Sequence, residues 1–132
     1  PATDVNALNA AGESALMLAA IAGDLESSQR LLARGARLDG PGWTPIHYAA
    51  SGPNTRLVEL LLSRGASLEA EAPNGTTALM LAAQTGPEAT VELLLRRGAD
   101  ARRRNQRDLQ AADFARQGGR DWLADRLELM TK

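Results

Sequence analysis

Apolar residues recur along the chain at intervals of three and four positions, which is the spacing of one face of an α-helix. Strict alternation of apolar and polar residues, the mark of a half-buried strand, is not the pattern here. The sequence therefore predicts short helices in pairs, packed closely wherever two alanines adjoin. The first helices carry Leu16/Ala19/Ala20, Ile46/Ala49/Ala50 and Leu79/Ala82/Ala83, and the second helices carry Val58/Leu61/Leu62 and Val91/Leu94/Leu95.

Residues that start and stop helices flank these apolar sets. A Ser or Thr before a helix can accept a hydrogen bond from a free backbone N–H, and a proline fits the first helical position. A glycine after a helix can adopt the left-handed conformation that closes it. Structural roles of this kind are expected for Ser14, Thr44, Pro45 and Thr77 at the starts and for Gly35, Gly65 and Gly98 at the ends.

The helix pairs repeat with a fixed period. The segments "SALMLAAIAG" (14–23), "TPIHYAASG" (44–52), "TTALMLAAQTG" (76–86) and "LQAADFARQGG" (109–119) are versions of one another. With Ser14, Thr44, Thr77 and Gln110 taken as equivalent, the spacings are 30, 33 and 33 residues, which predicts a repeat protein. Gly35 to Thr44 spans three positions fewer than Gly65 to Thr77, so the finger of the second repeat is expected to be short, with Trp43 at its base.

The segments "DGPGWTPIHYAASG" and "PNGTTALMLAAQTG", followed by "LLLSRGA" and "LLLRRGA", resemble the ankyrin-repeat pattern. The resemblance implies an all-α solenoid of stacked helix-turn-helix units with short β-hairpin fingers. We expect one domain, residues 1–132, divided into units at 4–36, 37–66, 67–99 and 100–132. The last unit departs from the pattern and is expected to be a C-terminal cap, with Trp122 covering its core.

His47 is the only histidine in the chain, and it allows two interpretations. A catalytic base would need a nucleophile within hydrogen-bonding reach and a third group to orient it. In ankyrin-like repeats, by resemblance, the Thr and His of this motif bond to backbone and join consecutive hairpins. Met17, Met80 and Asp113 occupy the equivalent positions, so we favour the structural role for His47.

Composition narrows the chemistry further. The chain lacks cysteine, its single lysine is Lys132, and no loop has the spacing of calcium ligands or of a phosphate-binding motif. We therefore expect no enzyme activity, no cofactor and no metal site. The longest apolar run, Ala15–Ala22, is eight residues, far below the roughly 18 to 20 that a membrane helix needs, so we expect no membrane insertion.

The resemblance implies a module that binds another protein. Such arrays use their concave face, meaning the exposed side of the first helices together with the inner sides and tips of the fingers. Trp43 and Tyr48 are the expected anchors, because aromatic residues are frequent interface hot spots, although Trp43 could instead lie along its own finger. We expect a monomer whose partner contacts come from Trp43, Tyr48, Ser51, Asn74, Thr76, Leu81, Gln84, Arg107 and Phe114.

Charge is unevenly distributed along the chain. Residues 1–95 hold five arginines and ten acids, whereas residues 96–132 hold ten basic residues and six acids. Arg96, Arg97, Arg102–Arg104 and Arg107 could attract nucleic acid or anionic headgroups, but they have no aromatic residue among them, and we do not expect nucleic-acid binding. The other alternative is the regulatory portion of a larger enzyme.

Source and location are only weakly indicated. Fourteen of the fifteen cations are arginine and 25 residues are alanine, a composition that suggests a GC-rich, bacterial genome. The compartment stays open between the cytoplasm and a periplasmic or secreted location reached after removal of an upstream segment.

The beginning of the chain allows two interpretations as well. "DVNA" (4–7) matches the tail that an ankyrin-like unit leaves after its helices, which favours an upstream helix or partial repeat. Ser27, Ser28 and Arg30 stand where the second unit has Leu57, Val58 and Leu60, and this polarity favours an N-terminal cap. Both interpretations remain open at the level of sequence.

Overall fold

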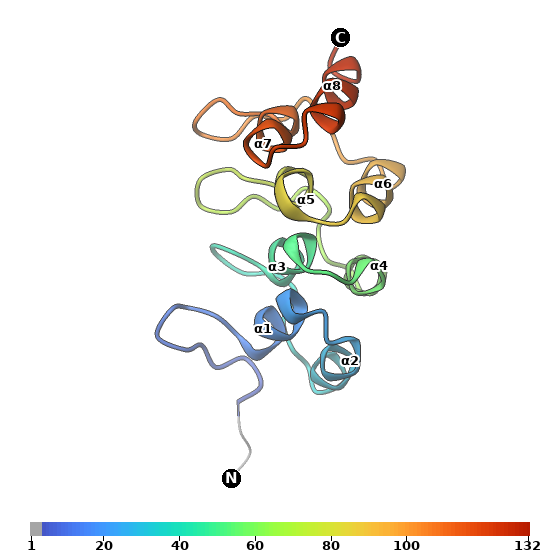
Figure 1. Ribbon diagram of the computed structural model, residues 1–132. Helices are drawn as coiled ribbons and strands as arrows, with labels where there is room; N and C mark the ends of the chain where they lie inside the picture. The colour runs from blue at the N-terminus through green and yellow to red at the C-terminus, as the bar shows by residue number, and fades with distance from the viewer. Residues whose placement is uncertain (1–3) are drawn as a thin grey trace.

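The computed structural model describes residues 4–132 and contains, within that range, eight α-helices and no β-strand. The helices form four consecutive pairs that stack along one direction, from the N-terminal to the C-terminal end (Figure 1). We keep the names unit 1 to unit 4 for these pairs. They are α1 (Ala15–Ala22) with α2 (Leu25–Ala33), α3 (Pro45–Ser51) with α4 (Thr55–Ser63), α5 (Ala78–Thr85) with α6 (Glu88–Arg96), and α7 (Ala111–Gln117) with α8 (Asp121–Leu129).

The helices lie in two layers, with fingers projecting from one side of the stack. The first helices, α1, α3, α5 and α7, form one row and the second helices form the other (Figure 1). The first helices make the closest contacts between units, α1 with α3, α3 with α5 and α5 with α7. The all-α solenoid expected from the sequence is therefore confirmed.

Small side chains allow this close stacking. Ala49 and Ala82 are at most 1% exposed, and Leu61 and Leu94 of the second helices are fully buried. Gly86 follows α5 at a point where an added Cβ would overlap the carbonyl oxygen of Ala50 in the preceding unit. This close packing depends on alanine and glycine, because protein interiors tolerate few voids and few overlaps.

Each finger precedes a first helix and ends in a tight turn. In the fingers of units 1, 3 and 4 a backbone pair closes the turn, and Ala72 N–H donates to the Thr76 carbonyl at 2.9 Å in unit 3. Finger 2 (residues 34–44) has 11 residues between helices, against 14 in finger 3 (64–77) and 14 in finger 4 (97–110). Among residues 4–132 no such pair closes the tip of finger 2, so the shortening predicted from the repeat spacing is confirmed.

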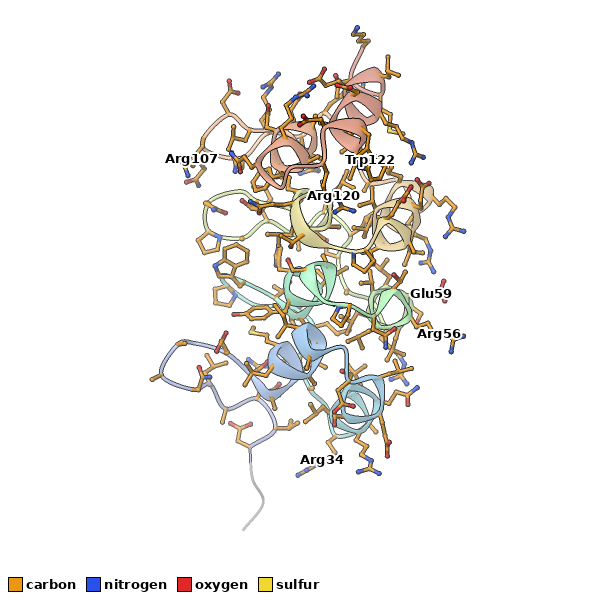
Figure 2. The ribbon with its side chains drawn as sticks, viewed as in Figure 1. Arg34, Arg56, Glu59, Arg107, Arg120 and Trp122 are labelled. Atoms are coloured by element: carbon orange, nitrogen blue, oxygen red, sulfur yellow. The ribbon has the colours of Figure 1, made fainter. Side chains whose placement is uncertain are left out.

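Unit 4 differs from the expectation for Trp122. Leu123, Ala124 and Leu127 on α8 are fully buried, whereas Trp122 is 53% exposed. Its ring lies beside the guanidinium group of Arg120, whose Cζ is 5.9 Å from the ring centroid (Figure 2). The expectation that Trp122 covers the core is therefore wrong, because it sits at the start of α8 on the solvent side of the helix.

Candidate binding surface

His47 lies on α3 with its ring buried between two fingers. The Thr44 N–H donates to Nδ1 at 3.0 Å, so Nδ1 is the acceptor and the proton resides on Nε2. Nε2–H donates in turn to the carbonyl of Ala70, in finger 3, at 2.9 Å. Both ring nitrogens are thus occupied by backbone groups, one at the start of the same helix and one in the next unit.

The environment of His47 favours its neutral form. Burial lowers the pKa of His47 from 6.5, outweighing the hydrogen bond to the Ala70 carbonyl that acts in the opposite direction. The ring is 1% exposed. A general base needs a nitrogen that can reach a reacting proton, and this ring offers none.

An apolar pocket of about 200 Å³ opens on the concave face next to His47. Three consecutive first helices and finger 2 contribute its walls. Two of these helices, α3 and α5, pack directly on each other. The lining residues are Ile21 from α1, Trp43 from finger 2, His47, Tyr48 and Ser51 from α3, and Leu81 from α5, so the structure brings together Trp43, Tyr48, Ser51 and Leu81 of the nine residues expected to contact a partner.

Trp43 packs against α3 and also remains accessible. Its ring packs edge-on against His47, with centroids 5.4 Å apart and an interplanar angle of 82°. It nevertheless remains 38% exposed and forms one wall of the pocket. The packing contact therefore leaves part of the Trp43 side chain exposed at the pocket.

Tyr48 is fixed by a contact that the sequence analysis missed. Its hydroxyl donates to Oε2 of Glu13, in finger 1, at 3.1 Å. Partial burial and the neighbouring Glu13 carboxylate both raise the pKa of Tyr48. The phenol therefore stays protonated at neutral pH and joins α3 to the preceding finger.

The remaining five expected contact residues lie outside the pocket. Gln84 is half-buried on α5, and Asn74 is exposed in finger 3. Arg107 is exposed in finger 4 (Figure 2). Thr76 is 1% exposed and accepts a hydrogen bond from Asn105, and Phe114 is 8% exposed within the core of unit 4. The expectation that Thr76 and Phe114 contact a partner is therefore wrong, because neither side chain has enough exposed surface for a partner to touch.

Three of the six arginines between residues 96 and 107 are paired with acids. Arg103 lies 3.1 Å from Glu71 and 3.5 Å from Glu69, both in the preceding finger. Arg102 pairs with Asp100, and Arg104 pairs with Asp108. These carboxylates reduce the positive potential that the sequence predicted at this end.

A second hollow, of about 370 Å³, separates fingers 1 and 2 and was not anticipated. Leu8, which is 62% exposed, faces it from finger 1, and Arg37 and Pro41 face it from finger 2. Trp43 and Tyr48 line both this hollow and the apolar pocket. The sequence did contain a signal for this hollow. Finger 2 is three residues shorter than fingers 3 and 4, so the tip of finger 2 extends less far beside finger 1.

Residues 4–132 contain no group of three or more His, Asp or Glu side chains placed to hold a metal ion. None of the eight described helices has the length and apolarity needed to cross a membrane.

Comparison with known proteins identifies the repeat. The family described as "Ankyrin repeats (3 copies)" matches residues 16–105. "Ankyrin repeat, SAM and basic leucine zipper domain-containing protein 1" of Chlorocebus aethiops is 41% identical over 85 residues, covering 59% of this chain and 18% of that protein. Its counterpart in Echinops telfairi is 35% identical over 104 residues, covering 74% of this chain and 22% of that protein. The chain spans about a fifth of the length of these mammalian relatives, and it belongs to the ankyrin-repeat family.

Proposed function

We propose that this protein is a non-enzymatic, monomeric binding module that holds one protein partner on its concave face. The observation that carries the proposal is the apolar pocket between α1, α3, α5 and finger 2. Large apolar side chains are exposed along this face, with Leu18 and Ile21 each 43% and Trp43 38% accessible. Contiguous exposed apolar surface on a rigid frame is typical of a protein interaction site.

Membership of the ankyrin-repeat family supports this reading, because its members are typically protein-interaction modules without catalytic activity. Asn74, Gln84 and Arg107 are proposed as peripheral contacts around the pocket, since they lie on neighbouring fingers and on α5. The alternative, an Arg-driven binder of nucleic acid or anionic headgroups, is less favoured because Arg102, Arg103 and Arg104 each face a carboxylate. As a regulatory portion of a larger enzyme the module would use the same concave face.

The test is an affinity measurement with a purified partner. The partner is recovered from the source lysate, identified, produced recombinantly and titrated against the wild type, Ile21→Ser and Trp43→Ala. We expect both variants to bind at least about tenfold more weakly, a change of about 1.4 kcal/mol. Leu129→Ser is the matched control, because Leu129 is an exposed apolar residue, 69% accessible, on α8 at the far end of the array.

The pattern of losses decides the outcome. Weak binding by the pocket variants, with unchanged circular dichroism and unchanged binding by Leu129→Ser, supports the proposal. Wild-type affinity in both pocket variants would refute it. Tight binding of single-stranded DNA or of phosphatidylserine vesicles, with an affinity that falls steeply as salt rises, would favour the Arg-driven alternative.

A further inference from the structure

The two ends of the array are built differently. At the C-terminal end Arg116 occupies the position that is Ala20, Ala50 and Ala83 in units 1 to 3, where it is buried under the following unit. The Arg116 guanidinium pairs with Asp125, at 3.0 Å, and with Glu128, both on α8. Charged side chains thus lie on the C-terminal side of unit 4, where units 1 to 3 have an alanine.

At the N-terminal end the corresponding surface is uncovered and carries both apolar and polar residues. It lines a hollow of about 410 Å³, and we call this surface the open face. Its residues are Ala15, Ala19 and Ala22 of α1, Leu31 of α2, and the polar residues Asp24, Ser27 and Arg30. Ala15 is exposed and Ala19 and Leu31 are half-buried. Their equivalents in units 2 to 4 are all buried, namely Pro45, Ala78 and Ala111 for Ala15, Ala49, Ala82 and Ala115 for Ala19, and Leu61, Leu94 and Leu127 for Leu31.

Two polar residues of the open face have polar counterparts inside the array. Ser27 stands at the position of Thr90, which is buried and whose hydroxyl lies 2.8 Å from that of Thr55 in the preceding unit. Arg30 stands at the position of Arg126, which is half-buried and pairs with Glu92 in the preceding unit. Polarity at Ser27 and Arg30 is therefore compatible with stacking.

The backbone of finger 1 gives an independent indication. The Ala7 N–H donates to the Asp4 carbonyl at 3.1 Å, and the Asn6 N–H donates to the Asp4 carboxylate at 2.9 Å. The same two bonds occur at 100–103, where Arg103 N–H reaches the Asp100 carbonyl at 3.3 Å and Arg102 N–H reaches its carboxylate at 2.9 Å. At 100–103 this turn comes directly after a helix closed by Gly98.

We propose that the open face of unit 1 binds one further ankyrin-type helix pair, stacked on α1 and α2 and connected through the turn at residues 4–7. At each of the three interfaces between consecutive units, the surface equivalent to the open face is covered by the helix pair of the preceding unit. A helix pair of the same kind therefore fits the open face. A second copy of the chain, stacked head to tail, does not fit, because its C-terminal end presents the Arg116, Asp125 and Glu128 charges to alanines. The occupant is expected to carry an acid opposite Arg30, as Glu92 lies opposite Arg126.

The test adds such a pair to the existing protein. Residues 67–99 are fused in front of Asp4, so that Ala99 of the appended copy takes the place of residue 3 and its Glu92 faces Arg30. We expect a single unfolding transition with a Tm at least about 4 °C above the parent, together with slower amide hydrogen exchange in α1. Ala15→Glu is the matched control, because it is expected to leave the parent nearly unchanged and to remove the gain from the fusion.

A charge exchange gives a second measurement. Arg30→Glu is expected to lower the Tm of the fusion, and Glu92→Arg in the appended copy is expected to restore it. An appended unit that melts separately or is cleaved by protease, while residues 4–132 unfold at the parental temperature, would overturn the proposal. So would a parent that is dimeric by light scattering and becomes monomeric on Ala15→Glu, because a second copy would then cover the face.

Discussion

At the scale of single residues, His47 shows how one side chain joins two repeats. Its ring connects the start of α3 to finger 3, so a change there affects the seam between units 2 and 3 and not only one helix. His47 also lines the apolar pocket. Substitutions of His47 therefore test stability, and substitutions of other pocket residues test the proposed binding.

Replacing His47 is expected to weaken folding and to alter its pH dependence. His47→Ala should lower the free energy of unfolding by about 1–3 kcal/mol, since Ala70 and Thr44 lose buried partners. Because burial lowers the pKa of His47 below 6.5, the unfolded chain takes up the proton more readily. The contribution of neutral His47 to stability is therefore complete above pH 6.5. It is lost as the pH falls through the lower pKa of the folded state.

Denaturant titrations at pH 7.5 and pH 5.5 measure this effect, with His47→Gln as the control that cannot titrate. The wild type should lose more stability between the two conditions than His47→Gln does. An equal loss in both proteins would show that carboxylates, and not His47, dominate the acid sensitivity.

Ser28 is a second residue with a specific consequence. It is 0% exposed on α2, and within the described residues its hydroxyl has no hydrogen-bond partner. Val58, Val91 and Ala124 occupy the same position in the other units. An unsatisfied buried hydroxyl is costly, so this position reduces the stability of unit 1.

Ser28→Ala is accordingly expected to stabilise the protein by about 1 kcal/mol, measured as the free energy of unfolding in urea. Ser63→Ala on α4 is the control, because Ser63 is exposed and gains the same helix propensity without removing a buried hydroxyl. A gain for Ser63→Ala equal to that for Ser28→Ala would attribute the effect to helix propensity alone.

At the scale of elements, the fingers show how backbone conformation and stacking combine. Gly12 and Gly75 occupy equivalent turn positions with φ of 81° and 79°. A Cβ on Gly75 would meet the backbone of Asn105 and Gln106 at 3.3 Å, whereas one on Gly12 would meet nothing within 4 Å. Finger 4 rests on finger 3 here, and Gln106 N–H donates to the Asn74 carbonyl at 2.9 Å.

Substituting these two glycines separates the effect of backbone strain from the effect of contact between fingers 3 and 4. Gly12→Ala should cost about 1–2 kcal/mol, the strain of a side chain in the left-handed region. Gly75→Ala should cost more, because it also moves finger 4 away from finger 3. Thermal unfolding of both variants gives the comparison, and equal losses would show that the fingers contribute nothing through their mutual contact.

Arg120 gives a prediction for a helix end. Its Nη1 donates to the carbonyls of Ala82, Ala83 and Gly86 at 3.1, 3.2 and 2.7 Å, so it satisfies the C-terminal end of α5 from the next unit (Figure 2). Helix ends leave carbonyls without partners. Arg120→Met should lower the free energy of unfolding by about 1.5–3 kcal/mol, the range for hydrogen bonds to charged groups.

Arg107→Met is the matched control for Arg120, because Arg107 is exposed at the tip of finger 4 (Figure 2). We expect it to leave stability nearly unchanged in the same urea titration. If both substitutions cost the same, the contribution of Arg120 would be general charge and not its bonds to α5.

The positions of the helices were largely predictable from the sequence, whereas the exposure of their side chains was not. Ser14, Thr44 and Thr77 each stand one residue before a helix, because capping is a local interaction that sequence spacing reveals. Phe114 occupies the position of Tyr48 and Leu81 yet is buried. Depth of burial depends on the neighbouring unit, and a repeat pattern within one chain indicates which residues vary without indicating what covers them.

At the scale of the whole molecule, burial rises from the N-terminal end towards the middle of the stack. In α2 only Ser28 is buried, and in α1 only Leu16 and Ala20 are. In unit 3, five residues of α5 and four of α6 are buried. Each unit of a solenoid is stabilised by its neighbours. Unit 1 has the fewest buried helical residues of the four units, so we expect it to be the least stable.

Native-state hydrogen exchange should therefore be graded along the array. Local opening requires less free energy where few apolar contacts are lost, so amides of α2 should exchange fastest among the helices and those of α5 slowest. α8 should exchange more slowly than α2 although both are terminal second helices, because Leu123, Ala124 and Leu127 are fully buried. Ser28→Ala should slow exchange in α2 more than in α5, since it removes a local defect and leaves the centre of the stack unchanged. Uniform exchange rates across all eight described helices would contradict the gradient and would indicate that the array opens only as a single cooperative body.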